Sequence, residues 1–268
     1  MIDIGANLTH KSFRRDFSAV LDRARAAGVS AIVVTGTSLP ASRAAWELAE
    51  ETRTEGPKLY ATAGVHPHQA STWSSDAAIE IRALAARPEV VAIGECGLDF
   101  DRNFSPPDAQ LRAFEAQLAI AADLGLPVFL HERSAHAAFI EVLARARKTL
   151  SRAVVHCFTG TGDELARYLD LDLHIGLTGW ICDERRGAHL RAIVPRIPRD
   201  RLMIETDAPF LLPRDMPRGV RPSDGRNEPC FLPHVLRAVA SARGEPESDV
   251  TQATIDTSQR FFDLSKIR

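Results

Sequence analysis

The chain has 268 residues, of which 45% are hydrophobic and 25% are charged, and these fractions are those of a globular protein with a sizeable core. A formal net charge of −2 excludes a broad basic face of the kind that coats nucleic acid regardless of sequence. No apolar run approaches the roughly 18 residues of a membrane-spanning helix, and the start lacks the pattern of a secretory signal. We therefore expect a cytoplasmic protein without a membrane partner. The four cysteines contain no C-x-x-C pair, which fits reduced thiols.

Eight short apolar segments alternate with stretches of helical periodicity along the chain. The predicted strands lie at 1–8, 31–35, 60–66, 90–95, 127–131, 153–156, 171–176 and 202–207. The clearest helix carries Leu111, Phe114 and Leu118 on one face, and a long loop rich in proline and arginine is predicted at 209–228. The regular alternation predicts a single α/β domain over residues 1–268, folded as a (β/α)8 TIM barrel. No G-x-G-x-x-G fingerprint favours an open nucleotide-binding sheet instead.

Four of the predicted strands end in side chains that bind metal ions. Glu95 ends the fourth strand, His131 the fifth, His156 the sixth and Asp207 the eighth. A lone histidine at a strand end is more often a structural residue, so the prediction depends on the four groups together. The carboxyl ends of barrel strands meet at one rim, where active sites lie. Carboxylates and imidazoles gathered there predict a site for a divalent cation.

Further polar side chains are predicted at the same rim. His66 ends the third strand, next to the strand of Glu95, and we expect it to contact a substrate phosphate or a water molecule. Arg185 follows the seventh strand, and Arg221 and Arg226 follow the eighth. These arginines predict a local basic patch that binds substrate, although an ordinary solvated surface remains an alternative.

Six short motifs carry a family resemblance that covers nearly the whole chain. They are DIGANLT at 3–9, AGVHPH at 63–68, IGECGLD at 93–99, HCFTG at 156–160, ETDAP at 205–209 and RNEP at 226–229. In these motifs the chain resembles the TatD family of metal-dependent deoxyribonucleases. The resemblance implies that Glu95, His131 and His156 bind a divalent cation and that Asp207 is catalytic. It implies magnesium or manganese as the cofactor, with zinc as an alternative.

One departure from the family pattern concerns the first strand. Most members carry a His-x-His pair there, whereas Asn7 and Thr9 occupy those positions in this chain. The family's namesake is similar in this respect, so activity need not be lost. A full second metal site is not expected.

The expected function is hydrolysis of DNA phosphodiester bonds, with single-stranded or frayed ends as the favoured substrate. The 3′→5′ exonuclease direction comes from the resemblance alone. An alternative is an amidohydrolase or a deacylase of misacylated tRNA, because the same metal site could direct a water molecule at a carbonyl carbon. A barrel that binds nucleic acid without cutting it is a third reading, against which the four ligand-type residues argue. We expect a monomer with no obligate protein partner.

Overall fold

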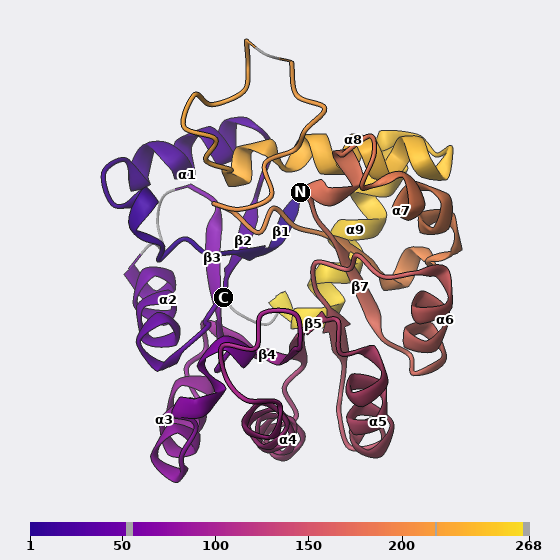
Figure 1. The fold of residues 1–268 in the computed structure, drawn as a ribbon. Coiled ribbons are helices and arrows are strands. Elements are labelled where there is room, and N and C mark those ends of the chain that lie inside the picture. The colour runs from indigo at the N-terminus through magenta and orange to yellow at the C-terminus, as the bar shows by residue number, and fades with distance from the viewer. Residues whose placement is uncertain (52–55, 218, 265–268) are drawn as a thin grey trace.

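Eight parallel strands form one sheet in the order in which they occur in the chain (Figure 1). The structure is a computed structural model and describes residues 1–51, 56–217 and 219–264. The strands are β1 (Ile2–Ala6), β2 (Ala31–Val34), β3 (Lys58–Ala63), β4 (Val90–Asp99), β5 (Val128–Arg133), β6 (Ala153–Val155), β7 (His174–Leu177) and β8 (Leu202–Ile204). The predicted (β/α)8 barrel is confirmed.

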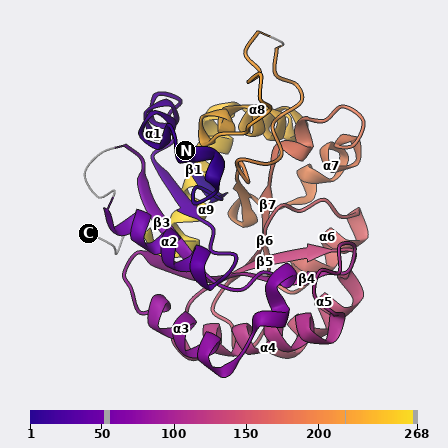
Figure 2. The same cartoon turned by 60° about the vertical axis from the view of Figure 1, so that its left-hand side comes forward.

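Helices connect the strands and surround the sheet on its outer side (Figures 1 and 2). They are α1 (Phe17–Ala26), α2 (Leu39–Glu51), α3 (Ser75–Ala85), α4 (Pro107–Leu124), α5 (His136–Ala146), α6 (Gly162–Asp170), α7 (Ala188–Ile193), α8 (Leu232–Arg243) and α9 (Glu247–Phe262). Their ends follow local chemistry: Thr161 and Glu164 form a capping box at the start of α6, and Gly125 ends α4 with a φ of 67°. Within the described ranges, no helix is long and apolar enough to cross a membrane.

Side chains alternate between two apolar layers along each strand, as the pleat requires. Leu202 and Ile204 of β8 pack among the surrounding helices, whereas Met203 between them belongs to a second cluster. That second cluster also contains Phe129 of β5, and Phe261 of α9 packs against it. The last helix therefore contributes to the barrel interior as well as to its outer layer.

The barrel closes between its first and last strands. The amide of Asp207 donates to the carbonyl of Gly5 (2.8 Å), and the amide of Asn7 donates to the carbonyl of Ala208 (2.7 Å). The buried carboxylate of Asp3 on β1 accepts from the amide of Thr206 (2.9 Å) and from its hydroxyl (2.6 Å). These contacts fix the residues after β8 against β1.

Several strand boundaries differ from the prediction, and three of the differences have a clear physical reason. β4 continues past Glu95 to Asp99, because Gly94 and Gly97 have φ values of 137° and 145° and allow a close approach to β5. A Cβ at Gly97 would collide with the carbonyl oxygen of His131. β8 ends at Ile204, where the chain turns to bond with β1, and β7 begins at His174 because 171 still belongs to the last turn of α6.

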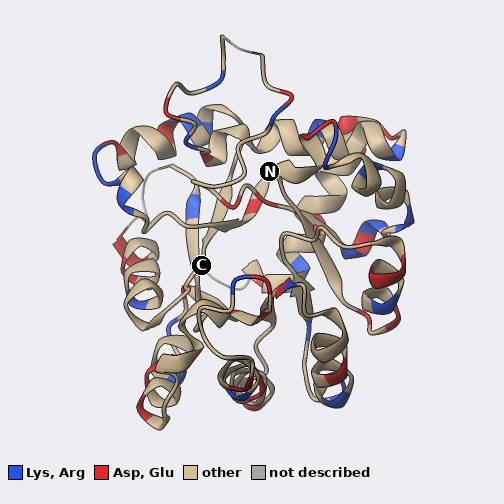
Figure 3. Ribbon diagram, viewed as in Figure 1, with Lys and Arg blue, Asp and Glu red and all other residues tan. Residues whose placement is uncertain are grey.

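The described parts of the predicted loop, 209–217 and 219–228, extend away from the barrel in both views (Figures 1 and 2). Acidic and basic residues are interspersed along the helices and this loop in the ribbon of Figure 3. This mixture of both signs along the described residues agrees with the formal net charge of −2.

The Asp3 carboxylate makes a prediction about stability and pH. Burial raises the pKa of the Asp3 carboxyl to about 7, even though Thr206 and Gly5 donate hydrogen bonds to it. The folded chain then holds a proton that the unfolded chain loses near pH 4. The stability from this proton is present below that pH and is lost as the pH rises through about 7.

In Asp3→Asn the amide oxygen can still accept from the backbone, and the amide nitrogen can donate to the hydroxyl of Thr206 in place of accepting from it. Because this side chain cannot ionise, we expect the variant to gain stability relative to wild type as the pH rises. The difference should grow by on the order of 4 kcal/mol across this window at most. Urea unfolding at several pH values measures it, with the exposed Asp22→Asn as the matched control. If the difference in unfolding free energy between Asp3→Asn and wild type did not change with pH, the raised pKa of Asp3 would be contradicted.

Candidate active site

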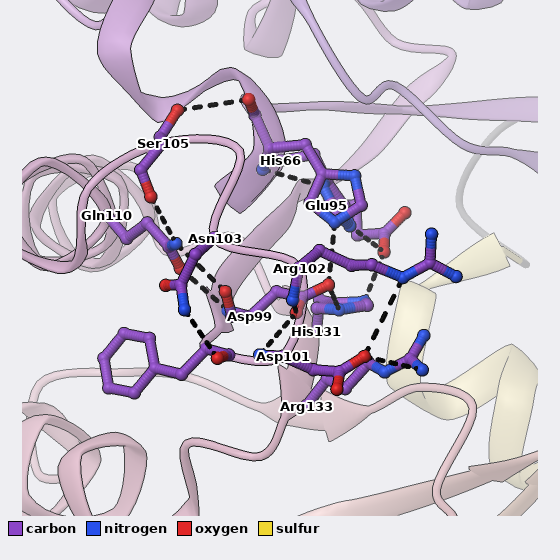
Figure 4. A network of polar contacts seen from close by, with 12 residues as sticks. His66, Glu95, Asp99, Asp101, Arg102, Asn103, Ser105, Gln110, His131 and Arg133 are labelled. Atoms are coloured by element: carbon purple, nitrogen blue, oxygen red, sulfur yellow. Dashed lines mark hydrogen bonds and ion pairs between the residues drawn. The ribbon is translucent and has the colours of Figure 1, made fainter.

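Three imidazole rings surround a single oxygen of Glu95. The nearest nitrogen of His156 lies 2.8 Å from Glu95 Oε1, that of His131 lies 2.9 Å away, and that of His66 lies 3.2 Å away. The nitrogens of His131 and His156 that face this oxygen are 3.4 Å apart. Figure 4 shows His66 and His131 converging on Glu95 from two sides. The structure therefore brings together three of the four predicted ligands and adds His66 to them.

Neighbouring strands deliver these side chains to one rim. His66 follows β3, Glu95 lies within β4, His131 lies within β5 and His156 follows β6. In the register between β4 and β5, His131 pairs with Gly97, two residues beyond Glu95. Consecutive parallel strands thus place their carboxyl ends side by side, as the sequence pattern predicted.

Charge in this cluster is shared between the carboxylate and the rings. Burial opposes ionisation of Glu95, but the potentials of His156 and His66 and hydrogen bonds from His131 and His156 outweigh it, so its pKa lies well below the usual range. Burial likewise opposes charge on His156, yet Glu95 and Glu205 raise its pKa well above the ordinary value. His66 differs, because burial dominates and lowers its pKa to about 4. A neutral imidazole is the form that binds a metal ion.

The donor set fits a divalent cation. The ligand atoms of His66, Glu95 and His131 all lie within 4.8 Å of one another. The nitrogens of His131 and His156 that face Glu95 are Nδ1 and Nε2, and their opposite ring nitrogens face other carboxylates, those of Asp99 (3.5 Å) and Glu205 (3.4 Å). One carboxylate oxygen cannot satisfy three ring nitrogens at good geometry, whereas a cation can accept an electron pair from each of them. These residues can therefore hold a metal ion.

Asp207 lies beside the cluster and has no direct hydrogen bond or ion pair with the histidines among those that the structure records. Its Oδ1 accepts a hydrogen bond from Nδ2 of Asn7 (2.9 Å). Burial raises the pKa of Asp207 to about 7, with repulsion from Glu95 and Glu205 acting in the same direction and His156 against it. A carboxyl group with this pKa can take or release a proton near neutrality.

Glu205 is a buried residue behind the cluster to which the sequence analysis gave no role. It is fully buried, its Oε1 accepts a hydrogen bond from the amide of Cys157 (2.5 Å), and its Oε2 lies 3.4 Å from Nδ1 of His156. A Cβ at Gly5 would collide with Oε2, and one at Gly176 would lie 2.7 Å from Oε1. A carboxylate behind a ligand histidine orients its ring and fixes its tautomer.

The signal for Glu205 was present in the sequence. Glu205 directly follows the apolar segment Leu202–Ile204, where a buried carboxylate requires a partner. The glycines that make room for Glu205 lie on the neighbouring strands β1 and β7, and only the fold connects them to it.

Asp99 links the cluster to the loop that follows β4. Its Oδ2 lies 2.7 Å from Nε2 of His68 and 3.5 Å from Nε2 of His131. Its Oδ1 accepts from the amides of Asp101 (3.1 Å) and Arg102 (2.9 Å), which shapes the loop (Figure 4). Asp99 thus both supports a histidine of the site and caps the loop.

The predicted arginines lie in different surroundings. Arg226 forms ion pairs with Asp16 (2.7 Å) and Glu228 (2.6 Å), so a phosphate would have to compete with two carboxylates for it. Arg221 is exposed on the protruding loop and donates to the carbonyl of Arg214 (2.6 Å), and Arg185 is exposed after β7. Arg218 of the same loop lies outside the described residues.

Two further arginines next to the site were missed by the sequence reading. Arg102 and Arg133 lie beside His131 in Figure 4, and Arg133 forms an ion pair with Asp101 (2.8 Å). Both keep about half of their side chains exposed, at 52% and 49%. Arg102 lies in the loop after β4, which has no periodicity, and Arg133 ends β5 beyond the predicted end of that strand at His131.

Comparison with known proteins identifies relatives over the whole barrel. The family model described as TatD related DNase matches residues 2–263. A protein of Musicola paradisiaca named 3′-5′ ssDNA/RNA exonuclease TatD is 54% identical over 268 residues, which cover 99% of each chain. A protein of Erwinia tasmaniensis with the same name is 53% identical over 264 residues, covering 98% of this chain and 100% of its own.

Solved structures agree with this match. A TatD homologue from Escherichia coli superposes with a TM-score of 0.88 at 30% identity and covers 98% of both chains. A hydrolase of the TatD family from Entamoeba histolytica also has a TM-score of 0.88, at 26% identity, covering 98% of this chain and 97% of its own. The predicted family resemblance is confirmed.

The first prediction from the site concerns Glu95→Gln, which keeps the volume of the side chain and removes its charge. We expect the affinity for Mn²⁺ to fall by more than about 100-fold, the upper end of the cost of losing a group that only supports a ligand. Calorimetric titration of the metal-free protein with Mn²⁺ measures it, and Glu141→Gln on the exposed face of α5 is the matched control. Unchanged Mn²⁺ affinity would place the metal site elsewhere.

The second prediction concerns the number of ions. Asn7 donates to Asp207 rather than offering an imidazole, so a second cation near Asp207 has little to offset its desolvation. We expect one tightly bound Mn²⁺ in the native chain and tighter binding of a second ion after Asn7→His combined with Thr9→His. Two equally tight ions in the native protein would contradict this view.

Proposed function

Because the chain belongs to the TatD related DNase family, we propose that it is a metal-dependent 3′→5′ exonuclease that hydrolyses phosphodiester bonds of single-stranded DNA. The names of the relatives from Musicola paradisiaca and Erwinia tasmaniensis, which include RNA, support this direction and extend the substrate to RNA. We infer Mg²⁺ or Mn²⁺ as the ion, with Zn²⁺ as an alternative, and residues 1–268 acting as one domain.

The observation that carries the proposal is the carboxylate of Glu95 within 3.2 Å of three imidazole nitrogens, next to Asp207, whose carboxylate accepts a hydrogen bond from Asn7. In this proposal Glu95, His66, His131 and His156 hold the ion. A divalent cation bound there would polarise a phosphoryl oxygen and lower the pKa of a bound water molecule. Asp207 would accept the proton of the attacking water, and Asn7 would hold its carboxylate in place.

The substrate phosphates require positive charge at the same rim. We propose that Arg102, Arg133 and Arg185 contact the backbone of the nucleic acid, with Arg221 reaching it from the protruding loop. Arg226 contributes less in this scheme, since Asp16 and Glu228 already neutralise it. We further propose that the enzyme acts as a monomer in the cytoplasm, where its four free thiols would stay reduced.

The amidohydrolase or aminoacyl-tRNA deacylase reading is not favoured. A solved structure from Saccharomyces cerevisiae described as an uncharacterized amidohydrolase is similar, with a TM-score of 0.83, but it is only 27% identical. The relatives above 50% identity carry the name of an exonuclease.

Product analysis on end-labelled oligonucleotides tests the proposal. With Mg²⁺ or Mn²⁺, single-stranded DNA labelled at its 5′ end should shorten one nucleotide at a time, and a chelator should stop the reaction. Asp207→Asn should reduce the rate by about 10²- to 10⁴-fold, as loss of a general base does, while the DNA still binds. The exposed Asp22→Asn is the control variant.

Two outcomes of that experiment would contradict the proposal. Internal cuts without stepwise shortening would exclude an exonuclease. Release of the amino acid from an aminoacyl-tRNA, with its phosphodiester bonds left intact, would favour the deacylase.

A further inference from the structure

Two exposed phenylalanine side chains stand at the rim that carries the metal-binding cluster. Phe104, which is 66% exposed, lies in the loop after β4, and Phe210, which is 51% exposed, lies in the loop after β8. β4 and β8 are four places apart in the order of eight strands, so their loops lie on opposite sides of the barrel mouth. An aromatic ring left in water forgoes the free energy that its burial would provide.

Phe104 is connected to the cluster through one histidine. Its ring centroid lies 4.7 Å from that of His68, with the planes at 79°. The centroid of His68 lies 4.2 Å from that of His66, whose nitrogen is 3.2 Å from Glu95. One edge of the Phe104 ring is therefore supported by the active site, and much of the rest is open to solvent.

Phe210 is connected to the other side of the site. It is three residues beyond Asp207, and its amide donates to the carbonyl of Asp207 (3.0 Å). Its ring lies edge-on to His10, with centroids 5.7 Å apart. Phe210 thus stands next to the proposed base, as Phe104 stands next to the histidines.

Buried amide side chains hold the backbones of both loops in place. Gln110 donates to the carbonyls of Ser105 (2.8 Å) and Asp99 (3.0 Å), on either side of Phe104. Asn227 donates to the carbonyl of Phe210 itself (2.6 Å) and to that of Thr206 (2.9 Å). The two rings are exposed, yet they are carried on backbones fixed from within the protein. A preorganised surface of this kind reduces the entropy lost when a ligand binds.

We propose that Phe104 and Phe210 are stacking platforms for the two nucleobases that flank the scissile phosphate of a single-stranded end. This inference rests on the proposed nuclease function and names the part of the substrate that the two rings bind. Stacking tolerates every base, because each has a π face, and it requires a base that is free of its complementary strand. It is also indifferent to the sugar, so the same platforms serve DNA and RNA.

The test uses Phe104→Ala and Phe210→Ala together with oligonucleotides that lack one base. Each substitution should lower kcat/KM on ordinary single-stranded DNA by about 5- to 150-fold, the range of one lost base stack. The loss should disappear when the substrate already lacks the base that the ring stacks on. Phe104→Trp should keep the wild-type kcat/KM, whereas Phe104→Leu should lower it as Phe104→Ala does. The control is Ile79→Ala, at a 67% exposed position on α3.

A second readout does not depend on catalysis. With a chelator present, the fluorescence of 2-aminopurine placed at the last or next-to-last position should be quenched on binding to the wild type. The quenching should be lost with the corresponding Phe→Ala variant, while Mn²⁺ affinity and the melting temperature stay unchanged. Equal kcat/KM and equal quenching in wild type and variants would overturn the stacking proposal and leave the nuclease intact. A wild type that does not cut single strands would instead overturn the proposed function, and the inference with it.

Discussion

The buried negative charge of Glu95 is the constraint on which the rest of the site depends. An ionised carboxylate inside a protein is costly unless it is paired, hydrogen-bonded or bound to a metal ion. Three histidines from three different strands meet this requirement within 3.2 Å of one of its oxygens. Protons on the rings and a divalent cation are two ways to balance the same charge, so the affinity for metal must depend on pH.

The groups behind the histidines decide which of their nitrogens are available. Glu205 faces Nδ1 of His156, and Asp99 faces both His68 and His131. These carboxylates are themselves held by backbone amides, those of Cys157 and of the loop after β4. Backbone amides therefore hold these carboxylates, and the carboxylates in turn orient the histidines that would contact the ion.

The rim combines a metal-binding cluster carried by the strands with loops that reach toward the substrate. The cluster lies on or directly after the strands, whereas most side chains proposed to meet the substrate lie in the loops after β4, β7 and β8, with Arg133 at the end of β5. Asp207 stands at the boundary between the two, because backbone bonds to Gly5 and a side-chain bond from Asn7 tie it to β1. Closure of the barrel thus sets the position of the proposed base relative to the metal ligands.

The sequence by itself determined the alternation of strands and helices, the barrel and three members of the cluster. Apolar segments with Glu95, His131 and His156 at their ends are local patterns, and parallel strands convert such patterns into neighbours at one rim. The same kind of local pattern predicted Asp207 at this rim, but it did not predict that the described structure shows no hydrogen bond or ion pair between Asp207 and the histidines.

Only the tertiary structure decided that His66 contacts Glu95, that Glu205 supports His156 and that Arg226 is held by two carboxylates. It also decided that β4 continues beyond Glu95, through glycines that let it approach β5. The physical reason is the same in each case. Side-chain periodicity reports which face of its own strand a residue occupies, whereas hydrogen bonds and close approaches between distant segments depend on how the barrel closes.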